Sequence, residues 1–267
     1  MQYNAYLMEN ADEITRLEVK TDRNAIERQS RWAGIKPGMR VADIGCGAGI
    51  TSVILHELVS PNGTVVGVDS SPTRIEHARH HYGNKGLEFK FCDILSPLAD
   101  LGGFDFIWVR FLLEYYRSES FEIVRNLNGI LKPGGILCLI DLDHNSLNHY
   151  GMSQRLEQTI STAMKTLEET ANFDPYVGRK LYSFLYDLGY VDIDVMVDAH
   201  HLIFGELKEA DAFNWMKKIE VISRKIDYRF EDKSWGIEEF ISEFREFFSN
   251  PRRFTYSPLV SCRGRKP

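Results

Sequence analysis

A short loop in this chain combines an acidic residue with glycines in a pattern that suits ligand binding. The stretch VADIGCGAGI, residues 41–50, is an apolar run that contains Asp43 and continues into Gly45, Gly47 and Gly49. Glycine has no Cβ and adopts positive φ readily, so a ligand can approach the backbone of such a turn. The helix expected after the loop would add free N–H groups and a partial positive charge. The stretch is therefore predicted to bind a ligand.

Two ligand classes fit this loop, namely dinucleotides and S-adenosylmethionine (SAM). The dinucleotide fingerprint G-x-G-x-x-G needs its last glycine where this chain has Ile50. Asp69 ends the next strand-like run, about 20 residues on, where a carboxylate can accept hydrogen bonds from both ribose hydroxyls. Asp93 ends the third run, where it could accept from an adenine amino group. The glycines alone do not separate the two classes, and the acids strengthen the case for a nucleoside-containing ligand.

These residues need a scaffold that brings successive strand ends together. Between residues 40 and 141, strand-like runs alternate with amphipathic stretches; the runs are RVADI, TVVGVD, LEFKFCD, FDFIWV and GILCLID. Such alternation predicts βαβ units and a parallel sheet, which binds ligands at the carboxyl ends of its strands. Beyond residue 145 we expect more helices, a strand over 191–204 and a last strand over 254–265. LKPGG, before the fifth run, predicts a helix stop and a turn.

Composition limits the kinds of partner. The chain has 267 residues, a formal net charge of −6 and a pI of about 5.8, which argues against a nucleic-acid partner or insertion into an anionic membrane. Its four cysteines form no C-x-x-C pair, as expected for free thiols in a reducing compartment. We see neither a signal-peptide h-region nor an apolar run of membrane-spanning length. We expect a cytoplasmic protein.

The chain resembles the class I SAM-dependent methyltransferases of the ubiquinone/menaquinone-biosynthesis type, which act on small molecules. The resemblance is carried by VADIGCGAG, VVGVDSSP, FCDI, FDFIWVRFLLEY and LKPGGILCLID, and it covers roughly residues 35–145. It implies an α/β fold, Rossmann-like and doubly wound, with a mostly parallel seven-stranded sheet. The single domain, 1–267, would comprise an N-terminal helical lid (1–38), a SAM-binding core (39–144) and a helical cap with the last two strands (145–267).

The resemblance also implies a cofactor site. The residues it assigns to SAM are Asp43, Gly45, Gly47, Asp69, Ser70, Asp93, Ile94 and Arg110. Asp43 would reach the methionine end, and Asp69 the ribose. Asp93 and Ile94 would bind the adenine edge. The backbone carbonyl of Arg110 would contact the SAM amino group, and its guanidinium could clamp a carboxylate of SAM or a substrate anion. Two of these acids have a structural alternative to cofactor binding. Asp43 could cap the loop amides, and Asp93 could be an acid in a surface turn.

Methyl transfer requires few catalytic groups beyond the cofactor site. It is an in-line displacement, so a nucleophile must lie about 3 Å from the methyl with water excluded. A general base is needed only when the nucleophile carries a proton of high pKa. In DLDHNSLNHY, after the fifth strand, His144 is the candidate base because histidine titrates near neutrality, and His149 is a candidate substrate contact. Ordinary loop hydrogen bonding is the alternative for His144.

The N-terminal segment is expected to cover the pocket. Tyr3, Tyr6 and Arg16 are candidate lid or substrate residues, since an aromatic ring there could shield the sulfonium by cation–π attraction. Plain hydrophobic docking is the alternative. The pair His200-His201 falls within a strand pattern, which predicts that the two side chains point to opposite faces and serve packing.

Two other functions remain open from the sequence. One is a nucleotide-cofactor oxidoreductase of the NAD type, which Ile50 and Asp93 disfavour. The other is a non-catalytic SAM-binding regulatory protein. No metal is predicted, because Arg110 stands where strand four of a metal-dependent relative would supply an acid and would repel a cation. A nucleic-acid substrate is disfavoured, since VRFLLEY replaces the Asn/Asp-Pro-Pro-Tyr stretch that grips a flipped base. The acceptor atom (O, N or C) and the oligomeric state stay open.

Overall fold

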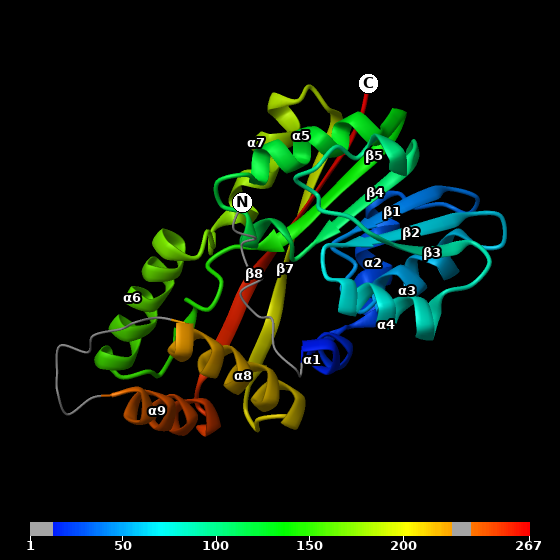
Figure 1. Ribbon diagram of the computed structural model, residues 1–267. Helices are drawn as coiled ribbons and strands as arrows, with labels where there is room; N and C mark the ends of the chain where they lie inside the picture. Colours follow the sequence, from blue (N-terminus) through cyan, green and yellow to red (C-terminus); the bar gives the residue numbers. More distant parts are fainter. Residues whose placement is uncertain (1–12, 226–235) are drawn as a thin grey trace.

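The computed structural model describes residues 13–225 and 236–267, and its centre is one mixed sheet (Figure 1). The strand order is β3-β2-β1-β4-β5-β8-β6, and β7 also pairs with β8. Strands β1 to β5 run parallel, whereas β8 is antiparallel to its neighbours. The strands are β1 (Arg40–Ile44), β2 (Thr64–Asp69), β3 (Leu87–Phe91), β4 (Phe104–Arg110), β5 (Leu131–Leu142), β6 (His149–Tyr150), β7 (Val191–Phe204) and β8 (Phe254–Arg265). The α/β prediction is confirmed, and the two-residue β6 is an addition to the seven expected strands.

The helices begin where the sequence supplies capping residues. Ser71 caps α4 by accepting a hydrogen bond from the Arg74 backbone N–H, with proline at the first helical position. Asp22 caps α2 in the same way. The helices are α1 (Glu13–Lys20), α2 (Arg23–Ala33), α3 (Ile50–Val59), α4 (Pro72–Tyr82), α5 (Ser120–Ile130), α6 (Gln154–Thr170), α7 (Leu181–Asp187), α8 (Glu209–Lys225) and α9 (Ile237–Ser249), with short 3₁₀ turns η1 (Ala99–Leu101), η2 (Leu113–Tyr115) and η3 (Val177–Lys180). No helix within the described ranges is both long and apolar enough to cross a bilayer.

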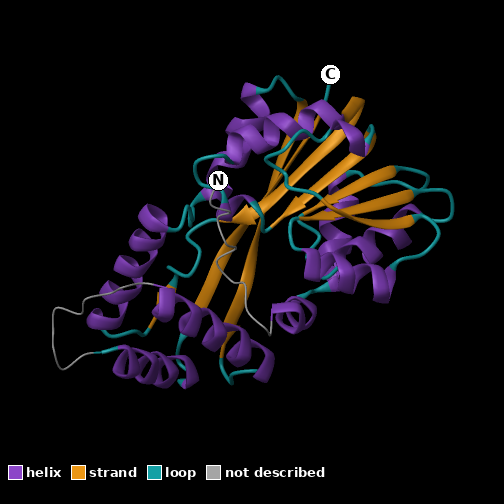
Figure 2. Cartoon of the chain, in the orientation of Figure 1, coloured by secondary structure: helices purple, strands orange, loops and turns teal. Residues whose placement is uncertain are grey.

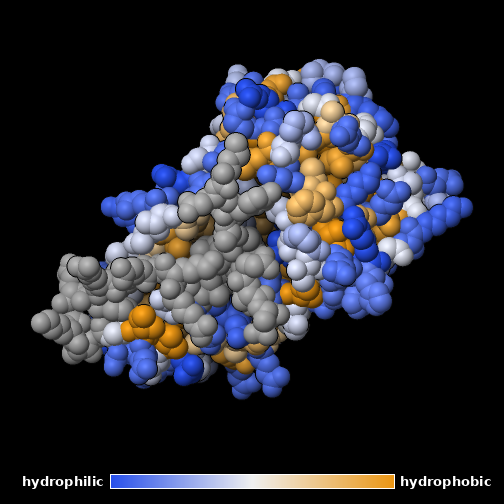
Figure 3. Space-filling model, in the orientation of Figure 1, coloured by the Kyte–Doolittle hydropathy of each residue, from blue (hydrophilic) through white to orange (hydrophobic). Residues whose placement is uncertain are grey.

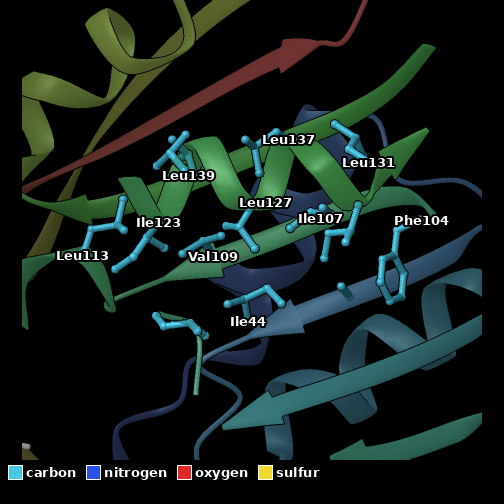
Figure 4. Packing of buried hydrophobic residues seen from close by; sticks show 14 of the residues in the cluster. Ile44, Phe104, Ile107, Val109, Leu113, Ile123, Leu127, Leu131, Leu137 and Leu139 are labelled. Carbon is cyan, nitrogen blue, oxygen red and sulfur yellow. The ribbon is translucent and has the colours of Figure 1, made fainter. Parts of the chain in front are cut away.

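The parallel sheet is buried on both faces. Alternate residues of each strand point to opposite sides, so Ile107 and Val109 of β4 join the core under α5 and α7, while Phe106 and Trp108 join the core under α2, α3 and α4. Figure 4 shows the first of these cores, where side chains of α5 pack on those of β4 and β5. This packing fixes the strand ends that carry the predicted site residues.

A separate group of helices lies beyond the sheet. Strands β7 and β8 are long, pair from Val191 with Arg265 to Phe204 with Phe254, and run out toward α6, α8 and α9 (Figures 1 and 2). These helices enclose a third core, in which the Trp215 ring stacks on Phe244 and packs at a tilt against Phe248. On the face that Figure 3 shows, hydrophilic residues cover much of the described surface, and hydrophobic residues gather near the centre of the view. The β7–β8 ribbon thus ties the cap to the sheet.

The LKPGG segment is a bulge within β5. Leu131 pairs with Phe104 and Ile136 pairs with Phe106, so residues 132–135 stand opposite one residue of β4. Gly134 has φ +76°, a conformation that glycine adopts without strain. The expected helix stop and turn are therefore present. The turn lies inside β5, because this strand begins at Leu131, before the apolar run that starts at Ile136.

Candidate functional site

A deep cavity lies at the carboxyl ends of β1, β2 and β4. Its volume, counted together with its open mouth, is about 1310 Å³. Among the residues predicted from the sequence, those that line it are Asp43, Gly45, Gly47, Asp69, Ser70, Ile94 and Arg110. They come from separate segments and meet because parallel strands end at one edge of the sheet. We call this the first cavity.

The glycine loop between β1 and α3 needs its glycines for backbone geometry. Gly45 has φ +77° and Gly47 has φ +54°, both in the left-handed region that disfavours other residues. A Cβ on Gly45 would lie 3.0 Å from a methyl carbon of Leu112. The backbone N–H groups of Gly45 and Cys46 donate to the Val68 carbonyl of β2. The loop is thereby held to the sheet with its backbone facing the cavity.

Gly49 supports the loop from behind and does not line the first cavity. It has φ +98°, and a Cβ there would lie 2.9 Å from Cβ of Ala78 and 3.0 Å from the Phe89 ring. We expect Gly49→Ala to lower the free energy of unfolding by about 2–4 kcal/mol, from backbone strain and overpacking together. Denaturant unfolding measures this, with Gly38→Ala as control, because Gly38 has φ +86° and open space around it. Equal losses in the two variants would contradict the packing role.

The Asp69 carboxylate organises the loop as well as facing the cavity. One oxygen accepts from the Gly47 backbone N–H at 2.9 Å. The other accepts from the Ser71 backbone N–H at 2.9 Å and from the Arg74 guanidinium at 3.0 and 3.2 Å. Asp69 is only 7% exposed, so these bonds are shielded from water. The residue predicted to hold the ribose therefore also holds the glycine loop.

Asp43 is a buried acid at the end of β1. It is 2% exposed, and one carboxylate oxygen accepts a hydrogen bond from the Ser52 hydroxyl at 2.6 Å. Burial raises the pKa of Asp43 to about 7, against the lowering effects of Ser52 and of the Arg110 charge. Among the described residues the carboxylate bonds this side chain of α3 and no loop amide, so the alternative role, capping of the loop amides, is not supported. A cation in the first cavity would stabilise the ionised carboxylate.

Arg110 and Phe111 lie together at the end of β4. Burial lowers the pKa of the Arg110 guanidinium to about 10, and its Nε has no hydrogen-bond partner among the described residues. The guanidinium carbon lies 4.1 Å from the centre of the Phe111 ring. Phe111 has φ +55°, a strained conformation that is often found at functional sites. A buried cation in this position is suited to an anionic group of a ligand.

Asp93 is the predicted cofactor residue that the first cavity does not include. Its carboxylate accepts from the Leu95 backbone N–H at 3.0 Å, which is the turn role weighed as an alternative. Its neighbour Ile94 is buried and does line the cavity. Of the two predicted adenine contacts, the structure thus places Ile94 at the first cavity and Asp93 outside it.

A second cavity adjoins the first under the cap. It encloses about 520 Å³ counted to its mouth, and both cavities are lined by Phe111 and Tyr115. Its polar lining residues are Arg16, Glu114, Asn145, Ser146, His200, His201 and Lys218, and its apolar ones include Leu142, Met164, Leu167, Phe173 and Ile222. A ligand here would lie next to a ligand in the first cavity, with Phe111 and Tyr115 at the border.

Glu114 is placed in the second cavity by a buried network. Its carboxylate accepts from the Asn145 amide at 2.6 Å, and its backbone N–H donates to Asp141 at the end of β5. Burial and the nearby Glu114 carboxylate raise the pKa of Asp141 well above the usual range. Asp141 therefore helps to hold η2 in place, and Glu114 is the carboxylate that lines the cavity.

The prediction for His200-His201 was wrong. Opposite faces were expected from strand periodicity, but the two rings lie 3.8 Å apart between centroids and both line the second cavity. The register of β7 against β8 shifts between His200 and Ile203, and His201 has φ +50°. A β-bulge of this kind turns two successive side chains to the same side. It brings both imidazoles to the candidate site.

The two histidines of the DLDHNSLNHY segment lie outside both cavities. His144 packs edge-on against Tyr176, with ring centroids 5.1 Å apart, and neither cavity includes it. His149 bonds Thr255 and the Ser146 carbonyl, and burial lowers the pKa of its imidazole to about 4. Both positions give the predicted catalytic and substrate roles no geometric support, and His149 is placed as a packing residue beside Trp215.

Of the lid residues, Arg16 lies in the site. Its guanidinium bonds both oxygens of Glu13 at 2.7 Å and the Asn214 amide oxygen at 3.2 Å, and it lines the second cavity. Leu17 and Thr21, also in the N-terminal segment, line the first. Tyr3 and Tyr6 lie outside the described residues. The helix α1 therefore borders both cavities.

Several site residues had not been singled out from the sequence. Phe111, Glu114 and Tyr115 stand in the VRFLLEY stretch directly after the fourth strand, a position that could have identified them. Lys218 carries no local signal, because it is one lysine of an amphipathic helix. The described residues contain no cluster of three or more histidines, cysteines or acids suited to a metal ion.

Comparison with known proteins decides the family. Residues 35–187, more than half of the chain, match the methyltransferase-domain family. The chain belongs to this family. The match of this methyltransferase domain spans the glycine loop, the strand ends around the first cavity and η2, so the family resemblance predicted from the sequence is confirmed.

Curated relatives match less than half of the chain, whereas solved structures of the same fold match nearly all of it. The domain is 28% identical over 116 residues to the demethylmenaquinone methyltransferase of Lactococcus lactis subsp. lactis, a match that covers 42% of this chain and 46% of that enzyme. A cyclopropane-fatty-acyl-phospholipid synthase-like protein from Lactobacillus casei has a TM-score of 0.62 at 15% identity, covering 98% of both chains. The phosphoethanolamine N-methyltransferase 2 of Haemonchus contortus has a TM-score of 0.60 at 14% identity, covering 100% of this chain and 61% of that one. These likenesses show the fold.

Proposed function

We propose that this methyltransferase domain transfers a methyl group from SAM, held in the first cavity, to a small-molecule acceptor held in the second. The observation that carries the proposal is the pair of adjoining cavities that share Phe111 and Tyr115. The family and the activity named for the Lactococcus lactis relative support it. The match covers less than half of that relative, so the acceptor does not carry over with the name.

The first cavity fits SAM by its own residues. Asp43 is a carboxylate whose pKa is raised by burial, and the α-ammonium and sulfonium of SAM are cations that would stabilise its ionised form. Gly45 and Gly47 leave room for a ligand beside the backbone, Asp69 would hold the ribose, and Ile94 the adenine. SAM supplies a methyl group already activated by the positive sulfur. Asp93 stays a proposed adenine contact that would require its carboxylate to leave the Leu95 backbone.

The remaining work of the protein is to position the acceptor and keep water out. Phe111 and Tyr115 border the two cavities, and their rings exclude solvent from the path between them. Glu114, His200 and His201 line the second cavity and are the groups placed to take a proton from an acceptor hydroxyl or amine. We propose these in preference to His144.

The division of the chain into lid, core and cap also enters this proposal. The α1 helix is fastened to the core, because Glu18 bonds His77 at 3.0 Å and Tyr82 at 3.1 Å. It is fastened to the cap through Arg16 and Asn214. We propose that 1–38 covers the SAM site, that 39–144 binds SAM and that 145–267 binds the acceptor. The net charge of −6 favours a small acceptor over a nucleic acid.

Calorimetric titration of the purified protein tests the cofactor. We expect SAM and S-adenosylhomocysteine to bind with dissociation constants on the order of micromolar, equivalent to about 8 kcal/mol, and NAD to show no binding. Binding of NAD instead would favour the oxidoreductase alternative and overturn the proposal. Binding of SAM without its conversion to S-adenosylhomocysteine, across acceptors that reach the second cavity, would favour the non-catalytic alternative.

A further inference from the structure

The charges that line the second cavity are mostly matched within the protein. Arg16 is paired with both oxygens of Glu13 and bonds Asn214. Glu114 accepts a short hydrogen bond from Asn145. Lys218 differs from these, since within the described part of the chain its ammonium forms neither a hydrogen bond nor an ion pair. Its Nζ lies 4.9 Å from the centre of the Trp215 ring.

Lys218 is held in a poorly solvated position by the packing of α8. Trp215, Ile219 and Ile222 of the same helix are buried in the cap core, which fixes the direction in which Lys218 points. Burial lowers the pKa of Lys218 to about 8. The side chain is nevertheless half-buried rather than enclosed, because it borders the cavity. The charge of Glu114 partly offsets the effect of burial, but the ammonium is only partly hydrated and forms no ion pair within the described residues, so a ligand anion would stabilise it further.

The rest of the lining limits what that anion can be attached to. Half of the residues that line this cavity are apolar or carry a phenyl or phenol ring, with Met164, Leu167 and Phe173 on the cap side and Phe111 and Tyr115 at the border with the first cavity. The Glu114 carboxylate in the same cavity would repel a second negative charge. A ligand with an apolar body and a single negative charge therefore satisfies the cavity best.

Building on the proposed function, we propose that the methyl acceptor is an apolar molecule with one carboxylate group, and that Lys218 binds this carboxylate. Lys218 is thus a specificity-determining residue that fixes the orientation of the acceptor. Arg16 contributes less, because its charge is already neutralised by Glu13. His200 and His201 complete the polar end of the cavity.

Matched probe pairs test the charge requirement. Binding of 2-naphthoate and 2-naphthamide, of benzoate and benzamide, and of octanoate and octanamide is measured by calorimetry in the presence of saturating S-adenosylhomocysteine. We expect at least one carboxylate to bind the natural protein at least about tenfold more tightly than its neutral amide, equivalent to about 1.4 kcal/mol. We expect this preference to vanish in Lys218→Met and to be retained in Lys218→Arg.

Lys217→Met is the control, because Lys217 lies on the same helix, pairs with Glu220 and does not line the cavity. It should keep the preference for the carboxylate. Equal binding of acid and amide, a preference that survives Lys218→Met, or no binding of any pair while S-adenosylhomocysteine binds normally would each overturn the proposal. Failure of S-adenosylhomocysteine itself to bind would instead contradict the proposed function, so the two failures are distinguishable.

Discussion

Asp69→Ala is expected to weaken SAM binding about 100-fold, which corresponds to a loss of about 2.7 kcal/mol. The carboxylate would accept from the ribose hydroxyls, and hydrogen bonds to a charged group contribute more than neutral ones. The same carboxylate also holds the Gly47 N–H at 2.9 Å, so its removal loosens the loop that lies against the ligand. Calorimetric titration with SAM and S-adenosylhomocysteine measures the effect.

Two variants separate the ligand contact from the structural role of Asp69. Asp69→Ala leaves Arg74 as a buried cation without its carboxylate, so the free energy of unfolding should fall as well. Asp69→Asn keeps one oxygen, which can accept either from Gly47 or from Ser71 and Arg74, because the natural carboxylate uses a different oxygen for each side. It should therefore retain part of the stability that Asp69→Ala loses, while losing most of the charge-assisted binding. Asp100→Asn, which changes an exposed acid in η1, should alter neither the SAM affinity nor the free energy of unfolding. Unaltered SAM affinity in a folded Asp69→Ala protein would remove Asp69 from the cofactor site.

Asp43→Asn is expected to raise the stability of the ligand-free protein and to weaken SAM binding. The folded-state pKa of Asp43 is about 7, above the ordinary value of 3.8, so the folded protein binds more protons than the unfolded chain between these two values. The contribution of Asp43 to stability therefore falls as pH rises from about 4 to about 7 and stays low above that. At about pH 8 the uncharged asparagine should add about 1–3 kcal/mol to the free energy of unfolding, after the weaker bond to Ser52 is counted.

The affinity for SAM should change with pH in the opposite direction. Because the ligand is cationic, it prefers the ionised carboxylate, and its affinity for the natural protein should rise between about pH 6 and pH 8. The Asp43→Asn protein should show a flatter profile. Denaturant unfolding and SAM titration at both pH values check the two halves of this prediction. A variant that is less stable than the natural protein at about pH 8, or that keeps the same pH profile for SAM, would show that Asp43 is not a buried charge facing the ligand.

The residues around the first cavity could largely be predicted before the fold was known. Asp43, the glycine loop and Asp69 each lie at the end of an apolar run, and the rule that parallel strands share a carboxyl edge is enough to group them. Asp93 shows the limit of this argument. A strand end places a residue at the edge, but the Leu95 backbone decides where its carboxylate points. Sequence periodicity does not contain that local hydrogen bond.

By itself, the sequence determined the order of helices and strands, the parallel core and the loop that would hold a cofactor, because each depends on short-range patterns of apolar, capping and glycine residues. Tertiary structure alone decided the second cavity. Arg16, Glu114, His200 and Lys218 are far apart in the chain and meet only because α1, η2, the β7 bulge and α8 pack around one space. The bulge moves His200 and His201 to one side of a strand whose alternation predicted opposite sides. Such a site arises from packing between distant elements, which no local pattern in the chain encodes.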